Sequence, residues 1–209
     1  MRKIKRFKIS TRQKEITRKV MRLGLDLSAD GLTDEITLTR FIVNLSQQLD
    51  PGTVYELNEN VLWDLPEHTV AAQGMFSACA VTLGTPCTEH ANTLQGNTQL
   101  AAQTVLFEFL RTATLFVLDL IKEQAEKEEY ETQEPQFVYV PKIGLAPVPK
   151  LFQDFPCVPK DTALKILPEL LKRINSDKID VTLQGEQILP AATVIFIVPW
   201  QKKRRKGKK

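Results

Sequence analysis

The sequence predicts an α+β fold. Helical patterns dominate the first two thirds of the 209 residues, β-rich runs cluster near the end, and regular strand–helix–strand alternation is absent. A hydrophobic content of 43% and a charged content of 25% are typical of a globular chain with a real core. The length fits one large domain or two small ones.

Two helices are predicted before residue 50. Residues 11–22 are polar with apolar positions at helical spacing, and this helix should end near Gly24. Residues 33–49 begin with Thr33 in the position of a cap and continue with an acidic first turn. Apolar residues then recur every three to four positions, which indicates one buried helical face.

The middle of the chain predicts two strands and two helices. Pro51-Gly52 indicates a turn, and residues 53–57 after it alternate as a strand does. Residues 75–83 form an apolar run typical of a buried strand, and Thr85-Pro86 suits the first turn of a short helix. The longest helical pattern covers residues 97–127.

The most apolar part of this long helix, residues 105–121, approaches the length of a membrane span. Glu108, Arg111 and Asp119 interrupt it, and each charge is costly in lipid. The sequence therefore favours a helix buried in a protein core and no membrane association. Glu108 and Arg111 lie three residues apart on one helical face, where they can form an ion pair.

The last third predicts a short strand at residues 137–140 and an amphipathic helix at residues 160–174, with Pro168 as a kink. Residues 179–183 and 192–200 are β-rich. The segment between these two runs is too long for a tight hairpin turn, so we expect a more elaborate connection.

A proline-rich segment, "GLAPVPKLFQDFPCVP" at residues 144–159, precedes the last predicted helix. Proline fixes φ and removes a backbone donor, which predicts that this segment is neither helix nor central strand. A long irregular segment inside a domain is either functional or a linker. Its place between a strand and a helix favours an integral loop and makes it the first place to look for a pocket.

Cysteine usage favours a reducing compartment. Cys79, Cys87 and Cys157 cannot all pair within the chain and no signal peptide is recognisable, so we expect free thiols and a cytoplasmic location. Cys87-x-x-His90 has the spacing of half a metal site. The one other histidine is His68 and a second half is absent from the sequence, so no metal is expected.

Both ends of the chain are strongly basic. Residues 1–14 and 202–209 each carry seven Lys/Arg and no acid, which leaves the body between them at about −11 within a net charge of +3. Such ends can hold nucleic acid or anionic lipid. No aromatic follows Trp200, so the sequence favours a solvated, disordered tail at residues 201–209 and disfavours nucleic acid as a partner.

Three segments resemble one known family in their order and spacing. The first has an apolar strand, the turn Thr82-Leu83-Gly84, a short helix and a long apolar helix. The second is Asp154-Phe155-Pro156 with the helix after it, and the third is "IDVTLQGEQILPAATVIFIVPW". These segments are similar to the reactivation domain of cobalamin-dependent methionine synthase and its stand-alone bacterial relatives. The matches to the family's Asp-Trp-Pro, L-T-E-S and Ala-Ala-Ser-Val patterns are Asp154, Phe155, Pro156, Leu183, Pro190, Ala191, Ala192, Thr193 and Val194. The segment that corresponds to L-T-E-S is altered and one residue shorter, and Glu186 is the one carboxylate left in it.

The resemblance, which spans about residues 10–200, implies a helical N-terminal part packed on a mainly antiparallel, twisted sheet. It implies an N-terminal helical and strand segment at residues 1–55, an activation-domain-like α+β domain at 56–200 and a basic tail at 201–209. Members of this family bind S-adenosylmethionine and dock on the cobalamin module, and the cofactors carry the chemistry. The chain would then be an accessory protein of corrinoid metabolism, partnered by a corrinoid protein or a methyltransferase.

The matched loop departs from the family where the ligand would bind. Counting back from Asp154, the family's tyrosine, glycine and arginine fall on Phe152, Leu151 and Pro147. Phe152 loses the hydroxyl, Leu151 prevents a close backbone approach, and Pro147 lacks the guanidinium that pairs with a carboxylate. We therefore expect a degenerate loop that binds S-adenosylmethionine weakly or accepts another small molecule.

The resemblance implies a ligand-binding set with no catalytic member and no metal ligand. Each residue also has a structural interpretation: the carboxylates can serve loop and turn backbone, and the rings can anchor the core. No nucleophile, general-base pair or triad can be assembled, so we do not expect an enzyme. A protein-interaction module unrelated to corrinoids, or a nucleic-acid-associated protein using its basic ends, remains an alternative. The expected ligand-binding residues are Phe152, Asp154, Phe155, Pro156 and Glu186.

Overall fold

The computed structural model describes residues 1–59 and 75–203 of the chain, and it confirms the α+β class. His68 and residues 204–209 of the predicted basic tail lie outside the described residues. The elements in chain order are β1 (Arg2–Lys5), α1 (Gln13–Met21), η1 (Ser28–Asp30), α2 (Glu35–Gln47), β2 (Gly52–Glu59), β3 (Met75–Thr82), α3 (Thr85–Thr93), α4 (Gly96–Lys127), β4 (Tyr130–Thr132), β5 (Gln136–Tyr139), α5 (Lys150–Asp154), α6 (Lys160–Arg173), η3 (Ser176–Ile179), β6 (Thr182–Gln184), β7 (Gln187–Leu189) and β8 (Thr193–Lys202).

The described residues form one six-stranded antiparallel sheet and a separate β6–β7 hairpin. The sheet order is β1-β2-β3-β8-β4, and β5 also pairs with β8. Side chains of β8 alternate between two cores: Val194 and Phe196 face one side, and Ile195 and Ile197 face the other. Because both faces of β8 are covered, its sequence is continuously apolar instead of alternating.

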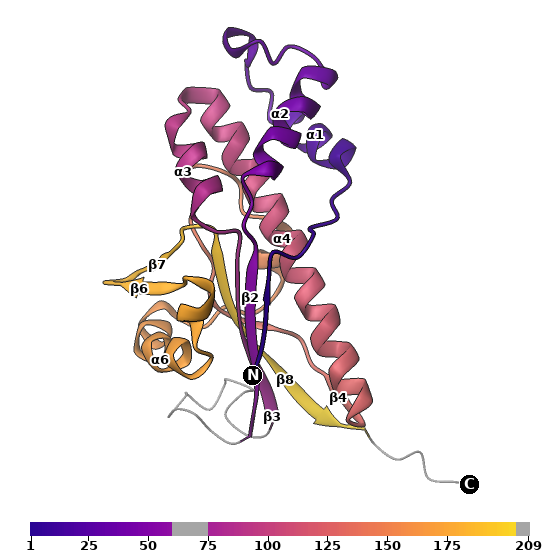
Figure 1. The fold of residues 1–209 in the computed structure, drawn as a ribbon, viewed down its shortest axis with the longest axis vertical. Coiled ribbons are helices and arrows are strands. Elements are labelled where there is room, and N and C mark those ends of the chain that lie inside the picture. The colour runs from indigo at the N-terminus through magenta and orange to yellow at the C-terminus, as the bar shows by residue number, and fades with distance from the viewer. Residues whose placement is uncertain (60–74, 204–209) are drawn as a thin grey trace, which may run out of the picture.

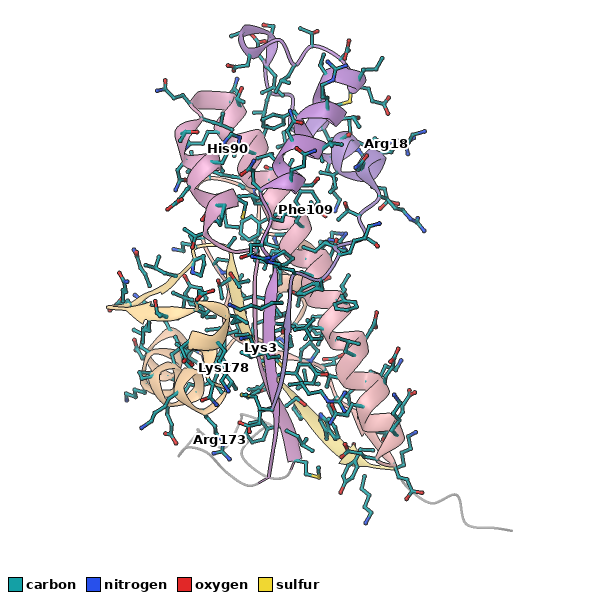
Figure 2. The ribbon with its side chains drawn as sticks, viewed as in Figure 1. Lys3, Arg18, His90, Phe109, Arg173 and Lys178 are labelled. Atoms are coloured by element: carbon teal, nitrogen blue, oxygen red, sulfur yellow. The ribbon has the colours of Figure 1, made fainter. Side chains whose placement is uncertain are left out.

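Helices cover the sheet on both faces (Figure 1). The long helix α4 runs along one face, and α6 with the hairpin lies on the other. The N-terminal helices α1 and α2 pack on α4 beyond one end of the sheet, and the buried Phe109 lies where this helical part meets the strands (Figure 2). The domain boundary predicted at residue 55 falls inside β2, whose hydrogen bonds continue into β3.

The predicted helices are confirmed, with differences at their ends. The cap of α2 is Asp34, one residue beyond the predicted Thr33. Its carboxylate accepts a hydrogen bond from the Thr37 amide at 2.7 Å, and the Thr37 hydroxyl accepts one from the Asp34 amide. The predicted turn at Pro51-Gly52 is wrong, because Gly52 is already the first residue of β2 and pairs with Thr82.

The buried helix and its ion pair are confirmed in α4. Glu108 is 6% exposed, and its Oε2 lies 2.9 Å from Arg111 Nε. The same oxygen lies 2.7 Å from Lys19 Nζ of α1, a partner that the sequence did not indicate. The carboxylate therefore fastens α1 to α4. Within the described ranges, none of the helices has the length and apolar character needed to cross a membrane.

Two segments near the candidate site differ from the predictions. The proline-rich segment was predicted to contain no helix, but it contains the five-residue helix α5. This helix begins directly after Pro149 and has no proline within it, so its backbone donors are intact. The connection after residue 183 is more elaborate than one turn, as expected, because it contains β7. Gln184 pairs with Gln187, so the hairpin turn consists of Gly185 and Glu186 alone.

Candidate functional site

A cavity of about 560 Å³ lies between β5, the start of α6 and the β6–β7 hairpin. This volume is within the range of small-molecule sites, roughly 300–1,000 Å³. The walls are mainly apolar and the rim is polar. The wall residues include Val138, Val158, Leu164, Leu167, Ile188 and Leu189, and the rim residues include Tyr139, Lys142, Cys157, Lys160 and Glu186.

Backbone hydrogen bonds fix one side of this cavity. The Phe137 amide donates to the Pro156 carbonyl at 2.9 Å, and the Val158 amide donates to the Phe137 carbonyl at 2.8 Å. The end of the proline-rich segment therefore runs parallel to β5 for one bridge, between Phe137 and Cys157. This pairing places Cys157 at the rim, and α6 begins directly afterwards at Lys160.

The hairpin fixes the opposite side. The two-residue turn needs a positive φ, which Gly185 supplies at +61°. Glu186, the other turn residue, thereby reaches α6, and its Oε2 lies 2.8 Å from Lys160 Nζ. The hydrogen bond from the ammonium to this carboxylate raises the pKa of Lys160.

The remaining polar groups on the rim, within the described residues, form no ion pair. Lys142 is exposed and has no ion-pair partner within the described ranges. Burial raises the pKa of the Tyr139 hydroxyl, partly opposed by a hydrogen bond with the Ile188 backbone. Partial burial also raises the pKa of the Cys157 thiol, so this thiol lacks the low pKa of an activated nucleophile. At neutral pH the rim thus carries two ammonium groups and one carboxylate.

The structure separates the five residues expected to bind a ligand. Phe152 is 3% exposed, and its ring packs edge-on against Phe137 at 5.3 Å between centroids, so it belongs to the core. Phe155 is half-buried against the same ring, while Asp154 and Pro156 are exposed. Within the described part of the chain, Glu186 alone among the five lines the cavity.

A smaller hollow of about 210 Å³ adjoins this cavity, because Lys142 and Ala191 line both. Besides Lys142, its polar lining residues come from two helices: Thr88 and Asn92 of α3 and Gln103 of α4. Gln103 is 8% exposed, and its Oε1 accepts a hydrogen bond from the Leu145 amide at 3.3 Å. Sequence reasoning missed these residues, because no local pattern marks side chains that converge from three distant segments.

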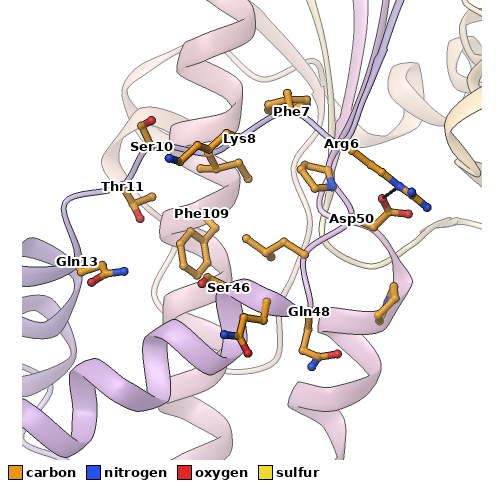
Figure 3. A pocket seen from close by; sticks show the side chains of 15 residues that line it. Arg6, Phe7, Lys8, Ser10, Thr11, Gln13, Ser46, Gln48, Asp50 and Phe109 are labelled. Carbon is orange, nitrogen blue, oxygen red and sulfur yellow. Dashed lines mark hydrogen bonds and ion pairs between the residues drawn. The ribbon is translucent and has the colours of Figure 1, made fainter.

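A larger hollow, about 890 Å³, lies elsewhere (Figure 3). It is formed by residues 6–11, the end of α2 and the buried ring of Phe109. Its charged pair, Arg6 Nε and Asp50 Oδ1 at 3.3 Å, is largely exposed. Because much of its lining comes from exposed polar side chains, and none of the expected ligand-binding residues lies in it, we take the cavity beside β5 as the candidate site.

Cys87 and His90, which have the spacing of half a metal site, lie in different environments in the structure. Cys87 is buried, and its thiol donates to backbone carbonyls of Leu83 and Gly84. His90 is exposed on α3 (Figure 2). In residues 1–59 and 75–203, no group of three or more His, Cys, Asp or Glu side chains is arranged to hold a metal.

Comparison of the chain with protein-family models and with curated proteins finds no match to either. The resemblance to the methionine synthase reactivation domain therefore depends on the residues quoted for it, and membership of that family stays a prediction.

Proposed function

We propose that this chain is a non-catalytic accessory protein of corrinoid metabolism that binds a small molecule in the cavity beside β5. One observation carries the proposal. Cys157 and Lys160, which follow the matched Asp154-Phe155-Pro156, and Glu186 of the hairpin, which lies in the altered counterpart of the family's L-T-E-S segment, line the same cavity. Lys160 and Glu186 are 26 residues apart in the sequence, and an ion pair with 2.8 Å between Nζ and Oε2 joins them.

S-adenosylmethionine is the first ligand to test. The apolar walls suit a flat ring, and the rim offers charges of both signs for an amino acid group. The proposed partner is a corrinoid protein or methyltransferase, because the related domains act beside a cobalamin module. The three free thiols support a cytoplasmic location as part of the proposal.

Calorimetric titration of the full chain with S-adenosylmethionine tests the ligand. The altered loop should leave a dissociation constant weaker than about 100 μM. Ala191 is exposed and small at the junction of both hollows, so Ala191→Phe should abolish binding by filling them. Ala29→Phe, at an exposed alanine of η1, is the matched control and should bind as the wild type does.

Two results would contradict the proposed binding of S-adenosylmethionine in this cavity. No binding at millimolar ligand excludes S-adenosylmethionine, and undiminished binding by Ala191→Phe places the site elsewhere. The partner is tested separately by size-exclusion chromatography with the cobalamin-binding module of a methionine synthase. Co-elution supports the corrinoid assignment, and separate elution at micromolar concentrations contradicts it.

A further inference from the structure

We infer that the cavity beside β5 and the smaller hollow form one bipartite site for an elongated monoanion, with an apolar body in the cavity and a carboxylate at Lys142. The inference rests on the part of the proposed function that places a small-molecule site in this cavity, and it favours an acid without a cationic group over S-adenosylmethionine, whose net charge is positive. Lys142 and Ala191 line both spaces, so the two spaces lie side by side at these residues.

The charge balance of the rim singles out Lys142. Glu186 is neutralised by Lys160 at 2.8 Å, which leaves the Lys142 ammonium as the uncompensated charge of the rim as described. No acidic side chain is among the described residues that line the smaller hollow. A single uncompensated ammonium matches a single negative charge, whereas a phosphate dianion calls for more cations or an arginine fork.

The amide of Gln103 supplies a second donor. Its Oε1 is occupied by the Leu145 amide, which orients the group and leaves Nε2 without an acceptor within the described ranges. Gly144, at φ +54°, lets this amide lie close to the backbone, because a Cβ there would overlap it. Gln103 and Lys142 thus both line the hollow, and both side chains carry N–H donors of the kind that carboxylate oxygens accept.

A matched pair of probes tests the carboxylate. We compare 5-phenylvalerate with the neutral 5-phenyl-1-pentanol, by calorimetry on the full chain at low salt. The wild type should bind the acid about tenfold more tightly, as expected for one charge-assisted hydrogen-bond set. Lys142→Gln should remove this preference, and Lys150→Gln, at an exposed lysine that lines neither space, should keep it.

A second variant tests the amide. Gln103→Glu keeps the size and the acceptor oxygen and replaces the donor by an anion, so the acid should lose about tenfold or more in affinity while the alcohol is unaffected. A thermal melt shows whether this variant is folded. If it is not, the Lys142→Gln comparison alone decides.

The outcomes separate this inference from the proposed function. If acid and alcohol bind equally and Ala191→Phe blocks both, the cavity binds small molecules and the carboxylate assignment is wrong. If the preference for the acid persists in Lys142→Gln, the inference is also overturned. If neither probe nor S-adenosylmethionine binds the wild type, both the inference and the proposed function fall.

Discussion

Lys160 Nζ and Glu186 Oε2 join the first residue of α6 to the hairpin turn across a distance of 2.8 Å. Both side chains are largely exposed, at 75% and 63%, so the pair adds little to stability. Its main effect is on charge, because it neutralises the carboxylate on the cavity rim. Which charge on the rim stays unpaired is therefore decided by a contact between two elements that the sequence keeps apart.

Glu186→Gln should strengthen the binding of 5-phenylvalerate several-fold, because it frees Lys160 as a second cation on the rim. The melting temperature should stay the same. Glu169→Gln makes the same change of charge on an exposed position of α6 that does not line the cavity, and it should leave affinity unchanged. Weaker binding by Glu186→Gln would instead show that this carboxylate contacts the ligand itself.

Glu108→Gln should destabilise the protein by about 1–2 kcal/mol, because the buried carboxylate holds both Lys19 and Arg111. Urea unfolding at neutral pH measures this cost. Lys19→Met removes the more exposed partner and should cost under about 1 kcal/mol. Glu123→Gln, on the exposed side of α4, should cost almost nothing, and an equal loss in both glutamine variants would contradict the role of Glu108.

Cys157 should be the one thiol that reacts with Ellman's reagent in the folded protein, since Cys79 and Cys87 are buried. Denaturation should expose all three. Because Cys157 lines the cavity, saturating 5-phenylvalerate should slow the labelling of its thiol, and folded Cys157→Ala should show no rapid labelling with or without the acid. Rapid reaction of two or more thiols under native conditions would show that the core opens more readily than its packing suggests.

Burial raises the pKa of Cys87 to about 12 and that of Cys79 well above its ordinary value. Above about pH 9 the unfolded chain loses these thiol protons while the folded chain keeps them, so stability should fall as pH rises. Cys87→Ala should remove up to about 1.4 kcal/mol per pH unit of this decline between pH 9 and 12. Urea unfolding with a reductant at several pH values measures the slope.

Cys157→Ala is the control for this slope. It removes a thiol that is exposed in the folded protein, so it should change the slope much less than Cys87→Ala does. The cavity that Cys87→Ala creates lowers stability equally at every pH, so only the slope is compared. A slope identical to that of the wild type would refute the contribution of the buried thiol.

The long elements were predictable because their signals are local. In α2 the apolar spacing predicts the buried side, and in α4 and β8 a continuous apolar run predicts burial on more than one side. β1 has no such signal: three of its four residues are Arg or Lys, and it is a strand because β2 offers it a pairing edge. The three-residue strands β4 and β7 are likewise fixed by their partners.

The residues of the candidate site likewise divide into those that a local sequence signal predicts and those that only the tertiary packing brings together. Glu186 was predicted because it is the one carboxylate in the segment that corresponds to the family's L-T-E-S pattern. Lys142 and Gln103 were not predicted, because they line one hollow only through the packing of α4 against the segment after β5. Phe152 has an aromatic side chain in a loop, which indicates a ligand contact or a core anchor, and only its neighbours Phe107 and Phe137 show that it is buried in the core.

Gly144→Ala should destabilise the protein more than Gly24→Ala. Both glycines have positive φ, +54° and +64°, so each substitution costs about 1–2 kcal/mol of backbone strain. At Gly24 a methyl group would meet no atom within 4 Å, whereas at Gly144 it would overlap the amide of Gln103. The difference between the two variants in urea unfolding therefore isolates the displacement of Gln103. If that amide is a ligand donor, Gly144→Ala also lowers the affinity for 5-phenylvalerate while Gly24→Ala does not. Equal destabilisation and equal affinity in the two variants would show that the close approach at Gly144 has no consequence for the site.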